Sequence, residues 1–240
     1  MRLLGRLVEA SNATFLAEEG DGGHVVYKPV AGEAPLWDFP SGTLGRREVA
    51  AYELSRAAGF DVVPPTRWAD DAPLGPGSVQ RWVEADGDDL AALVPVDQVP
   101  DGWFGVVLGL DDEDHEVVLV HADHPGLRRL ALFDVVANNA DRKAGHVIRR
   151  GDGVLGCDHG VSFHAEPKLR TILWGWAGEP LTPAETDLLR RTVEVAAQVL
   201  DPWLGAREAE ACEQRALGLL ADGHFPEPGD AWPVIPWPPI

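Results

Sequence analysis

Cysteines, lysines and long apolar runs are scarce in this sequence, and each scarcity excludes a class of protein. Of 240 residues, only Cys157 and Cys212 are cysteines, which is too few for a disulfide framework and matches no common zinc spacing. We expect both thiols to be reduced. No stretch approaches the roughly 18–20 apolar residues that cross a bilayer, and residues 1–15 lack the continuous apolar segment of a signal peptide. We therefore expect a cytoplasmic protein.

Positive charge is also scarce. Lysine and arginine total 20 against 39 acidic residues, which gives a formal net charge of −19. Such a surface repels phosphate backbones and anionic lipid headgroups, so the sequence predicts neither a nucleic acid nor a membrane as a partner. Only three basic residues are lysines, Lys28, Lys143 and Lys168, so a lysine in this chain is rare enough to be considered individually for a function.

The chain has ample apolar material, with both strand and helix periodicity. Hydrophobic residues make up 45% of it and nine residues are tryptophan, which is enough to bury a core in one compact unit. Residues 1–30 alternate as strands around turns, residues 46–58 have helical periodicity, and residues 78–84 alternate again. This pattern predicts an α+β fold in which Lys28, at a strand end, can meet Glu48 on the helix.

The rest of the chain is predicted to be a connector followed by helices. Residues 85–125 are rich in Asp, Gly and Pro and contain one strand pair, and residues 125–138 form an apolar helix typical of a core. A hairpin at 145–157 precedes two further helices at 182–200 and 206–221. The second half is therefore expected to be mainly helical.

These elements predict one domain over residues 1–225, with a first lobe at about 1–84 and a connector and second lobe at about 85–225. Residues 226–240 contain six prolines and are expected to form an extended tail. We expect this tail either to pack on the body through Trp232 and Trp237 or to be offered to a partner.

Two acidic motifs flank the predicted hairpin. Asp141 begins a loop after the apolar helix, His146 follows five residues later, and Asp158 comes after the hairpin, followed by His159 and Gly160. Phosphoryl transfer needs one carboxylate that orients the attacking hydroxyl and two groups that hold a metal ion against the phosphates. Either motif alone is a common turn sequence. Their order across a hairpin, behind an apolar helix, favours the catalytic interpretation.

The sequence around these motifs resembles a known family. Residues 132–142 and 157–163 are similar to the catalytic and metal-binding loops of the phosphatidylinositol 3-/4-kinases, especially the type II phosphatidylinositol 4-kinases. Residues 48–54 and 62–66 resemble the first-lobe helix of that family and the strand after it. The resemblance covers roughly residues 5–165 and implies a reduced, protein-kinase-like bilobal α+β fold that binds ATP with Mg²⁺ or Mn²⁺.

The resemblance also implies roles for individual residues. Asp141 corresponds to the catalytic aspartate. Lys28 corresponds to the phosphate-pairing lysine, with Glu48 as its helix partner and Glu53 as a competitor for that contact. The other implied positions are the phosphate-covering turn at Ser11, Asn12 and Thr14, the adenine-binding hinge at Gln80, Trp82 and Val83, and the metal ligands Asp158 and His146.

Two features depart from the family. His146 stands where the family has asparagine, and imidazole suits ions such as Mn²⁺ or Zn²⁺ better than Mg²⁺. Alternatively, His146 is a neutral hydrogen-bonding residue, with Asn138 or Asn139 near the metal. The charge of −19 is mismatched with an anionic bilayer, so the expected acceptor is a hydroxyl group of a soluble protein or small molecule.

Three other functions are compatible with the sequence. His146 favours a pseudokinase, which acts as a nucleotide-binding or regulatory protein without transfer activity. Transfer of AMP needs the same lysine and metal ligands as transfer of phosphate. A structural α+β module without a nucleotide site is the third.

The paired arginines and the clustered histidines are expected to be surface residues and not to form a binding site. Paired arginines on helices usually face solvent, and loop histidines without a metal-ligand spacing are usually polar surface. We therefore expect exposed positions for Arg46-Arg47, Arg128-Arg129, Arg190-Arg191, His115, His121 and His124.

Overall fold

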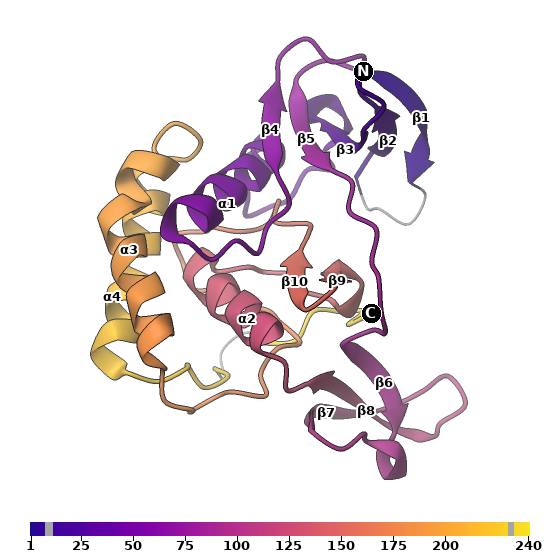
Figure 1. The fold of residues 1–240 in the computed structure, drawn as a ribbon, viewed down its shortest axis with the longest axis vertical. Coiled ribbons are helices and arrows are strands. Elements are labelled where there is room, and N and C mark those ends of the chain that lie inside the picture. Colours follow the sequence, from indigo (N-terminus) through magenta and orange to yellow (C-terminus); the bar gives the residue numbers. More distant parts are fainter. Residues whose placement is uncertain (8–11, 230–232) are drawn as a thin grey trace.

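The structure is a computed structural model that describes residues 1–7, 12–229 and 233–240. It has an upper lobe built around a β-sheet and a lower lobe built mainly of helices (Figure 1). An extended segment after residue 81 runs down one side of the molecule and joins the two lobes (Figure 1). The predicted bilobal α+β fold is therefore present.

The upper lobe is a five-stranded antiparallel sheet in the order β1-β2-β3-β5-β4. Successive side chains point to opposite faces of a strand, and Val25, Tyr27 and Val79 pack in a small apolar cluster on one face. Lys28 points to the opposite face, where helix α1 lies. The bounds are β1 Arg2–Leu7, β2 Thr14–Glu18, β3 His24–Pro29, the 3-10 turn η1 Val30–Gly32, β4 Thr66–Ala69 and β5 Gly77–Arg81.

Helix α1 spans Leu44–Ala58. The carboxylate of Glu33 accepts hydrogen bonds from the N–H groups of Leu44 and Gly45, at 3.3 and 2.9 Å, which satisfies the first turn of the helix. The helix ends where Gly59 adopts a left-handed φ of 80°. The buried face of α1 belongs to the same apolar core as the helices of the lower lobe, so α1 connects the two lobes.

The connector contains a three-stranded sheet in the order β6-β8-β7, where the sequence predicted a strand pair. The predicted pair is β7 (Trp103–Leu110) and β8 (Glu116–Ala122), and the additional strand is β6 (Ala91–Pro95), followed by the 3-10 turn η2 (Val96–Gln98). The β6 sequence has no alternation of polar and apolar residues, so a search for period two does not find it.

The predicted core helix is α2, which spans Pro125–Ala137 and ends at Asn138, whose φ of 54° is left-handed. Leu127 and Phe133 on α2 are fully buried in the core that α1 shares. Among the described residues, no helix is both long enough and apolar enough to span a bilayer. The remaining elements are the 3-10 turn η3 (Ala144–His146), the hairpin of β9 (Val147–Arg150) and β10 (Gly153–Gly156), and the helices α3 (Pro183–Leu200) and α4 (Ala206–Asp222).

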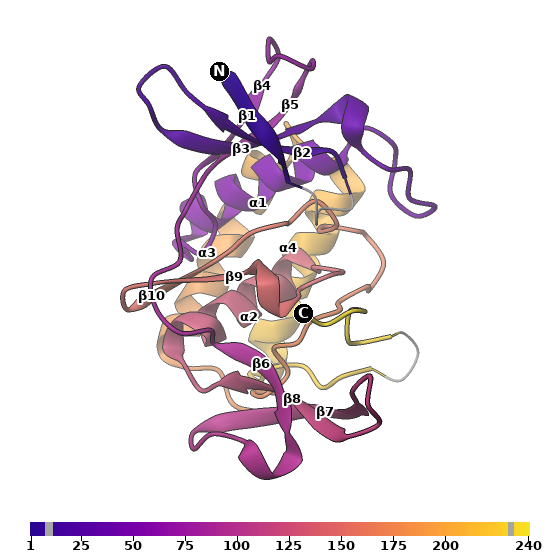
Figure 2. The same cartoon turned by 90° about the vertical axis from the view of Figure 1, so that its right-hand side faces the viewer.

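The tail returns to the loops that follow α2. The carbonyl of Val234 accepts a hydrogen bond from Thr171 N at 3.0 Å, and that of Pro239 accepts one from Ala144 N at 2.9 Å. Figure 2 shows the chain end beside β9. A proline-rich segment has few N–H donors but keeps its carbonyls, and the tail is attached through them.

Of the two alternatives for the tail, packing through Trp237 does not occur. Trp237 is 85% exposed, which leaves its side chain accessible to a partner. Trp232 lies outside the described residues.

Candidate active site

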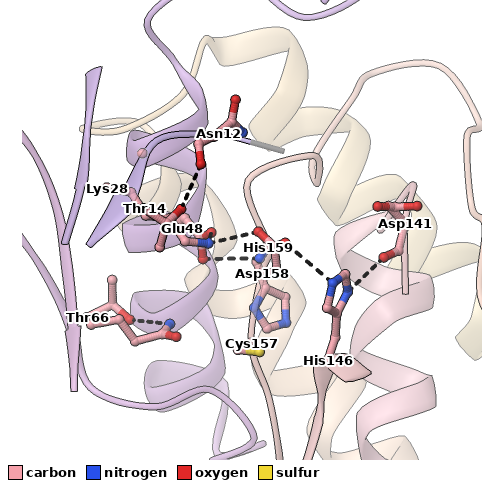
Figure 3. Close-up of polar contacts among 12 residues, drawn as sticks. Asn12, Thr14, Lys28, Glu48, Thr66, Asp141, His146, Cys157, Asp158 and His159 are labelled. Carbon is pink, nitrogen blue, oxygen red and sulfur yellow. Dashed lines mark hydrogen bonds and ion pairs between the residues drawn. The ribbon is translucent and has the colours of Figure 1, made fainter. Parts of the chain in front are cut away.

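Lys28 on β3 meets two carboxylates that are distant in the sequence. Its Nζ lies 2.5 Å from Glu48 Oε1 on α1 and 2.8 Å from Asp158 Oδ1, which follows β10 (Figure 3). The Lys28 side chain is 20% exposed and that of Glu48 is 3% exposed, whereas Asp158 is 51% exposed. The competing Glu53 instead pairs with Arg56 at 2.7 Å. The strand lysine and the helix glutamate therefore meet as predicted.

The opposite charges in this cluster determine the protonation states of Lys28 and Asp158. Burial alone would lower the pKa of Lys28, but Asp158 and Glu48 together raise it above its usual value. The Lys28 ammonium in turn holds the pKa of Asp158 below its usual range, against the opposing effect of burial. Lys28 is thus cationic and Asp158 anionic at neutral pH.

Glu48 also holds the backbone beyond Asp158. Its Oε2 accepts a hydrogen bond from His159 N at 3.1 Å. Gly160 also lies against α1, because a Cβ atom at this position would be in van der Waals contact with Leu44 Cβ at 3.4 Å. One carboxylate on α1 therefore joins the lysine strand to the Asp158 loop.

The loop that carries Asp141 is held in place by hydrogen bonds that run through Asn139 to Asp134. Asp141 N donates to Asn139 Oδ1 at 3.0 Å, and Asn139 Nδ2 donates to Asp134 Oδ1 at 3.0 Å. The Asp141 side chain is half-buried, and this burial raises its pKa. Lys143 Nζ lies 3.6 Å from Asp141 Oδ2, a contact that the sequence reasoning missed although Lys143 is one of three lysines.

Arg142 points away from Asp141, into the interior. It forms an ion pair with Asp134, at 2.7 Å between Nε and Oδ2. Its Nη1 also donates to Cys157 O at 2.7 Å. Arg142 therefore ties the Asp141 loop to the residue directly before Asp158.

His146 lies between the two aspartates. Its Nδ1 is 3.0 Å from the Asp141 carbonyl oxygen, and its Nε2 is 3.4 Å from Asp158 Oδ2 (Figure 3). Burial lowers the pKa of His146 to about 4, although Asp158 opposes the shift, so the ring is neutral at pH 7. Lys143 N also points to Nδ1, at the longer distance of 3.4 Å. The shorter contact to an oxygen that can only accept assigns the proton to Nδ1 and leaves the Nε2 lone pair facing Asp158.

This pair of donors fits a divalent cation. A neutral imidazole nitrogen and a carboxylate oxygen that face each other are both electron-pair donors. Among the described residues, no group of three or more His, Cys, Asp or Glu side chains could hold a metal ion. Mg²⁺ is commonly held by one or two protein groups plus phosphate oxygens and water, so two donors are sufficient beside a nucleotide.

The amides of Asn138 and Asn139, which the alternative placed near the metal, both form hydrogen bonds within the chain. Asn138 Nδ2 donates to the carbonyls of His164 and Glu166 at 2.8 and 2.7 Å, and its Oδ1 accepts from Lys168 N at 2.8 Å. Asn139 bridges Asp134 and Asp141, as described above. Both residues shape the backbone around the site.

Two of the three residues expected to form the hinge, Gln80 and Trp82, are engaged in the upper sheet. Gln80 is paired with Val26 in the sheet, and Trp82 N donates to His24 O at 3.0 Å, so neither has a free backbone donor. Among the described residues, the first backbone N–H groups after β5 without a protein partner are those of residues 83–85. Of the expected hinge residues, Val83 alone keeps its backbone groups available.

The predicted phosphate-covering turn is described in part. Ser11 lies outside the described residues. Asn12 Oδ1 accepts a hydrogen bond from Ala34 N at 2.7 Å, and Thr14 Oγ1 donates to Asn12 O at 3.4 Å. Both side chains are therefore used to shape the turn next to the end of β3 that carries Lys28 (Figure 3).

Three expectations of exposure are wrong. The Arg128 side chain is only 16% exposed and forms ion pairs with two glutamates. Arg47 is 1% exposed and forms an ion pair with Glu208 on α4. Arg47, Leu54 and Ala58 lie on one stripe of α1, so the helical periodicity contained the signal for its burial. His121 is also fully buried.

The fold brings the expected site residues of the two lobes together. Its upper sheet carries a lysine paired to a helix glutamate, and one extended segment joins it to a helical lobe that carries two aspartates. Protein Rv2133c of Mycobacterium tuberculosis (strain ATCC 25618 / H37Rv) is 44% identical over 259 aligned positions, which cover 99% of this chain and 91% of that protein. The chain belongs to the same family as Protein Rv2133c. No protein-family model matches the sequence.

Two solved structures of kinases are similar at low identity. The Golgi casein kinase gives a TM-score of 0.48 at 12% identity, with 93% of this chain and 76% of that chain covered. A Thermobifida fusca protein assigned as a fructosamine-3-kinase gives a TM-score of 0.35 at 13% identity, with 91% and 94% covered. Both TM-scores lie below 0.5, and the roles of individual residues rest on the contacts of this chain alone.

Proposed function

We propose that this chain is an ATP- and metal-dependent phosphotransferase. The observation that carries the proposal is the contact of Lys28 with both Glu48 and Asp158. These three residues come from three separate segments of the chain. A largely buried lysine held between two carboxylates carries a desolvation cost that stability alone does not explain. Its ammonium is suited to pair with a phosphate that approaches from the exposed side of Asp158.

Metal binding is proposed at Asp158 and His146. Their facing oxygen and nitrogen supply the protein part of a coordination shell, and Asp158 stays anionic beside Lys28. A bound Mg²⁺ or Mn²⁺ would neutralise charge on the phosphates of ATP. The neutral state of His146 supports this role, because a protonated imidazole cannot bind a cation.

Several apolar side chains support a site for the adenine base. Leu16 and Val26 pair across β2 and β3, and Val26 lies on the same face of β3 as Lys28. Ile148 and Leu155 pair across the hairpin that leads to Asp158. All four are half-buried and belong to neither apolar cluster of the described residues, as expected for side chains that would cover an aromatic ring. The free N–H groups of residues 83–85 would bind the edge of the base.

Asp141 is proposed to orient the acceptor hydroxyl. The hydroxyl oxygen would attack the γ-phosphorus while the bond from that phosphorus to the β–γ bridging oxygen breaks, so that ADP leaves and the hydroxyl proton passes to Asp141. The raised pKa of Asp141 makes its carboxylate a better proton acceptor. Lys143, 3.6 Å from Asp141, would offset negative charge that develops on the transferred group.

The acceptor is proposed to be a hydroxyl of a soluble protein or small molecule in the cytoplasm. The net charge of −19 disfavours approach to an anionic membrane or a nucleic acid. The resemblance to phosphatidylinositol 3-/4-kinases concerns the nucleotide and metal loops and stays a prediction. We also keep the division into lobes at residues 84 and 85 and the tail at 226–240 as proposals.

Phosphate release and transfer from γ-labelled ATP test the proposal. The purified protein should form labelled phosphate or a labelled acceptor with Mn²⁺ or Mg²⁺, and Asp141→Asn should reduce the rate by at least about 100-fold. The matched control is Asp152→Asn, which changes an exposed residue in the turn between β9 and β10. ATP binding without any turnover in wild type would support the pseudokinase alternative instead.

A further inference from the structure

Two neighbouring residues of α1 hold the segment after Asp158 at two points. Glu48 accepts a hydrogen bond from His159 N at 3.1 Å. Arg47 Nη1 donates one to Ser162 O at 2.7 Å. The segment from 159 to 162 is therefore attached to α1 near both of its ends.

Arg47 is itself firmly held. Its guanidinium forms an ion pair with Glu208 on α4 and lies 4.9 Å from the centre of the Phe39 ring. Its Nε lies 3.4 Å from Thr43 Oγ1. With 1% of the residue exposed, Arg47 bridges α1, α4 and the segment after Asp158 inside the protein.

The segment that Arg47 holds is bounded by two unfavourable backbone conformations. Asp158 has a φ of 59° and Phe163 a φ of 65°, both in the left-handed region. Aspartate tolerates this region, but a buried phenylalanine rarely adopts it. Phe163 N donates to Ala137 O at 2.6 Å, which anchors the far end on α2. Contacts from outside the segment are needed to keep this conformation.

We propose that Arg47 is a positioning residue that fixes the segment from Asp158 to Phe163 and thereby keeps the Asp158 carboxylate directed at Lys28. Glu48 secures the start of the segment and Arg47 secures its end, so loss of either lets Asp158 rotate away. The effect on nucleotide and metal binding rests on the proposed function. The ordering of the segment does not, because it follows from contacts within the chain.

Amide hydrogen exchange measures the ordering directly. The probes are the amides of His159, Ser162 and Phe163, each of which donates a hydrogen bond in the folded chain. In Arg47→Lys, a single ammonium cannot reproduce the fork that reaches both Ser162 O and Glu208. We expect these amides to exchange about tenfold faster, the loss typical of one charge-assisted hydrogen bond.

Two further variants separate positioning from general loosening. Glu208→Gln removes the negative charge that pairs with Arg47 but keeps an amide oxygen that can accept the capping hydrogen bond from Gly205 N, so it should raise exchange in the same segment less strongly. It also keeps the test available if Arg47→Lys does not fold. Arg191→Lys is the matched control, because Arg191 also ties α1 to the lower lobe, through Ala58 O at 2.8 Å, but far from Asp158. It should leave exchange of the segment unchanged.

A second readout tests the consequence for the site. Calorimetry with ATP should show the metal concentration for half-maximal binding rising about tenfold in Arg47→Lys and staying at the wild-type value in Arg191→Lys. Wild-type exchange rates in Arg47→Lys, or equal acceleration in Arg191→Lys, would overturn the proposal. If wild type binds no ATP, the proposed function fails, while the exchange data still decide whether Arg47 orders the segment.

Discussion

Arg142 and Asp134 form an ion pair in which neither side chain is exposed to solvent. Two hydrogen bonds join the guanidinium to the carboxylate, at 2.7 and 2.9 Å. The same guanidinium reaches Cys157 O, next to Asp158, while Asp134 reaches Asn139, next to the Asp141 loop. One buried pair thus fixes the spacing of the two aspartates proposed to carry the chemistry.

Loss of this pair should be costly. In Asp134→Ala the Arg142 guanidinium stays buried without a counter-charge, and removal of one member of a buried pair typically costs about 3–5 kcal/mol. Urea unfolding should show a loss of this size. The control is Asp187→Ala, which removes an exposed pair with Arg190 at 2.9 Å and should cost about 0.5 kcal/mol or less. Equal effects of the two variants would contradict the anchoring role of Asp134.

His146 should set the metal preference. In His146→Asn an amide oxygen replaces the imidazole nitrogen that faces Asp158, and hard oxygen donors favour Mg²⁺. The metal concentration for half-maximal ATP binding is measured separately with Mg²⁺ and with Mn²⁺. We expect the Mg²⁺ value divided by the Mn²⁺ value to fall by about tenfold, since replacing one ligand changes metal affinity by about one order of magnitude. The exposed His115→Asn is the control. An unchanged ratio would exclude His146 as a ligand.

His121 should make stability dependent on pH. Burial lowers its pKa below the usual value, against the hydrogen bond to Ala122 O and the charge of Asp123, and Gly175 N donates to its Nε2 at 3.0 Å. The unfolded chain takes up a proton below about pH 6.5, whereas the folded chain does not until the lower folded pKa is reached. Stability is therefore full above about pH 6.5 and falls as the pH drops towards the folded pKa.

Denaturant unfolding at about pH 7.5 and 5.5 measures this loss. His121→Gln should remove about 1 kcal/mol of the difference between the two pH values, because one protonation is no longer coupled to unfolding. Other buried histidines, including His159, keep part of the dependence. His115→Gln, at an exposed position, should leave the difference unchanged. The same pH dependence in wild type and His121→Gln would contradict this explanation.

The sequence predicted those parts of the site that depend on local patterns. Lys28 at a strand end, Glu48 on the next helix and Asp158 after a hairpin follow from periodicity and turn residues. The contact that completes the site was not predictable in the same way, because Lys28 and Asp158 are 130 positions apart. Only the order of the motifs and the family resemblance suggested it.

What the sequence did not reveal has one physical cause: polar side chains form tertiary contacts with residues that are distant in the sequence. Arg47 was expected in solvent because its partner Glu208 lies 161 positions away and belongs to another helix. The hydrogen bonds of the Asn138 amide to His164, Glu166 and Lys168 were likewise not visible in the sequence. Polar side chains near a site can thus be used by the fold itself, which local patterns do not show.

Calorimetric titration of ATP into the purified protein, with Mg²⁺ and then Mn²⁺, tests the central claim most directly. The account predicts metal-dependent binding that Lys28→Ala and Asp158→Asn each weaken by at least about tenfold, because a charge-assisted contact is lost in both. Glu53→Gln, a change on the same helix as Glu48 but outside the cluster, should bind as wild type does. No binding with either metal, or equal binding by all variants, would contradict the account.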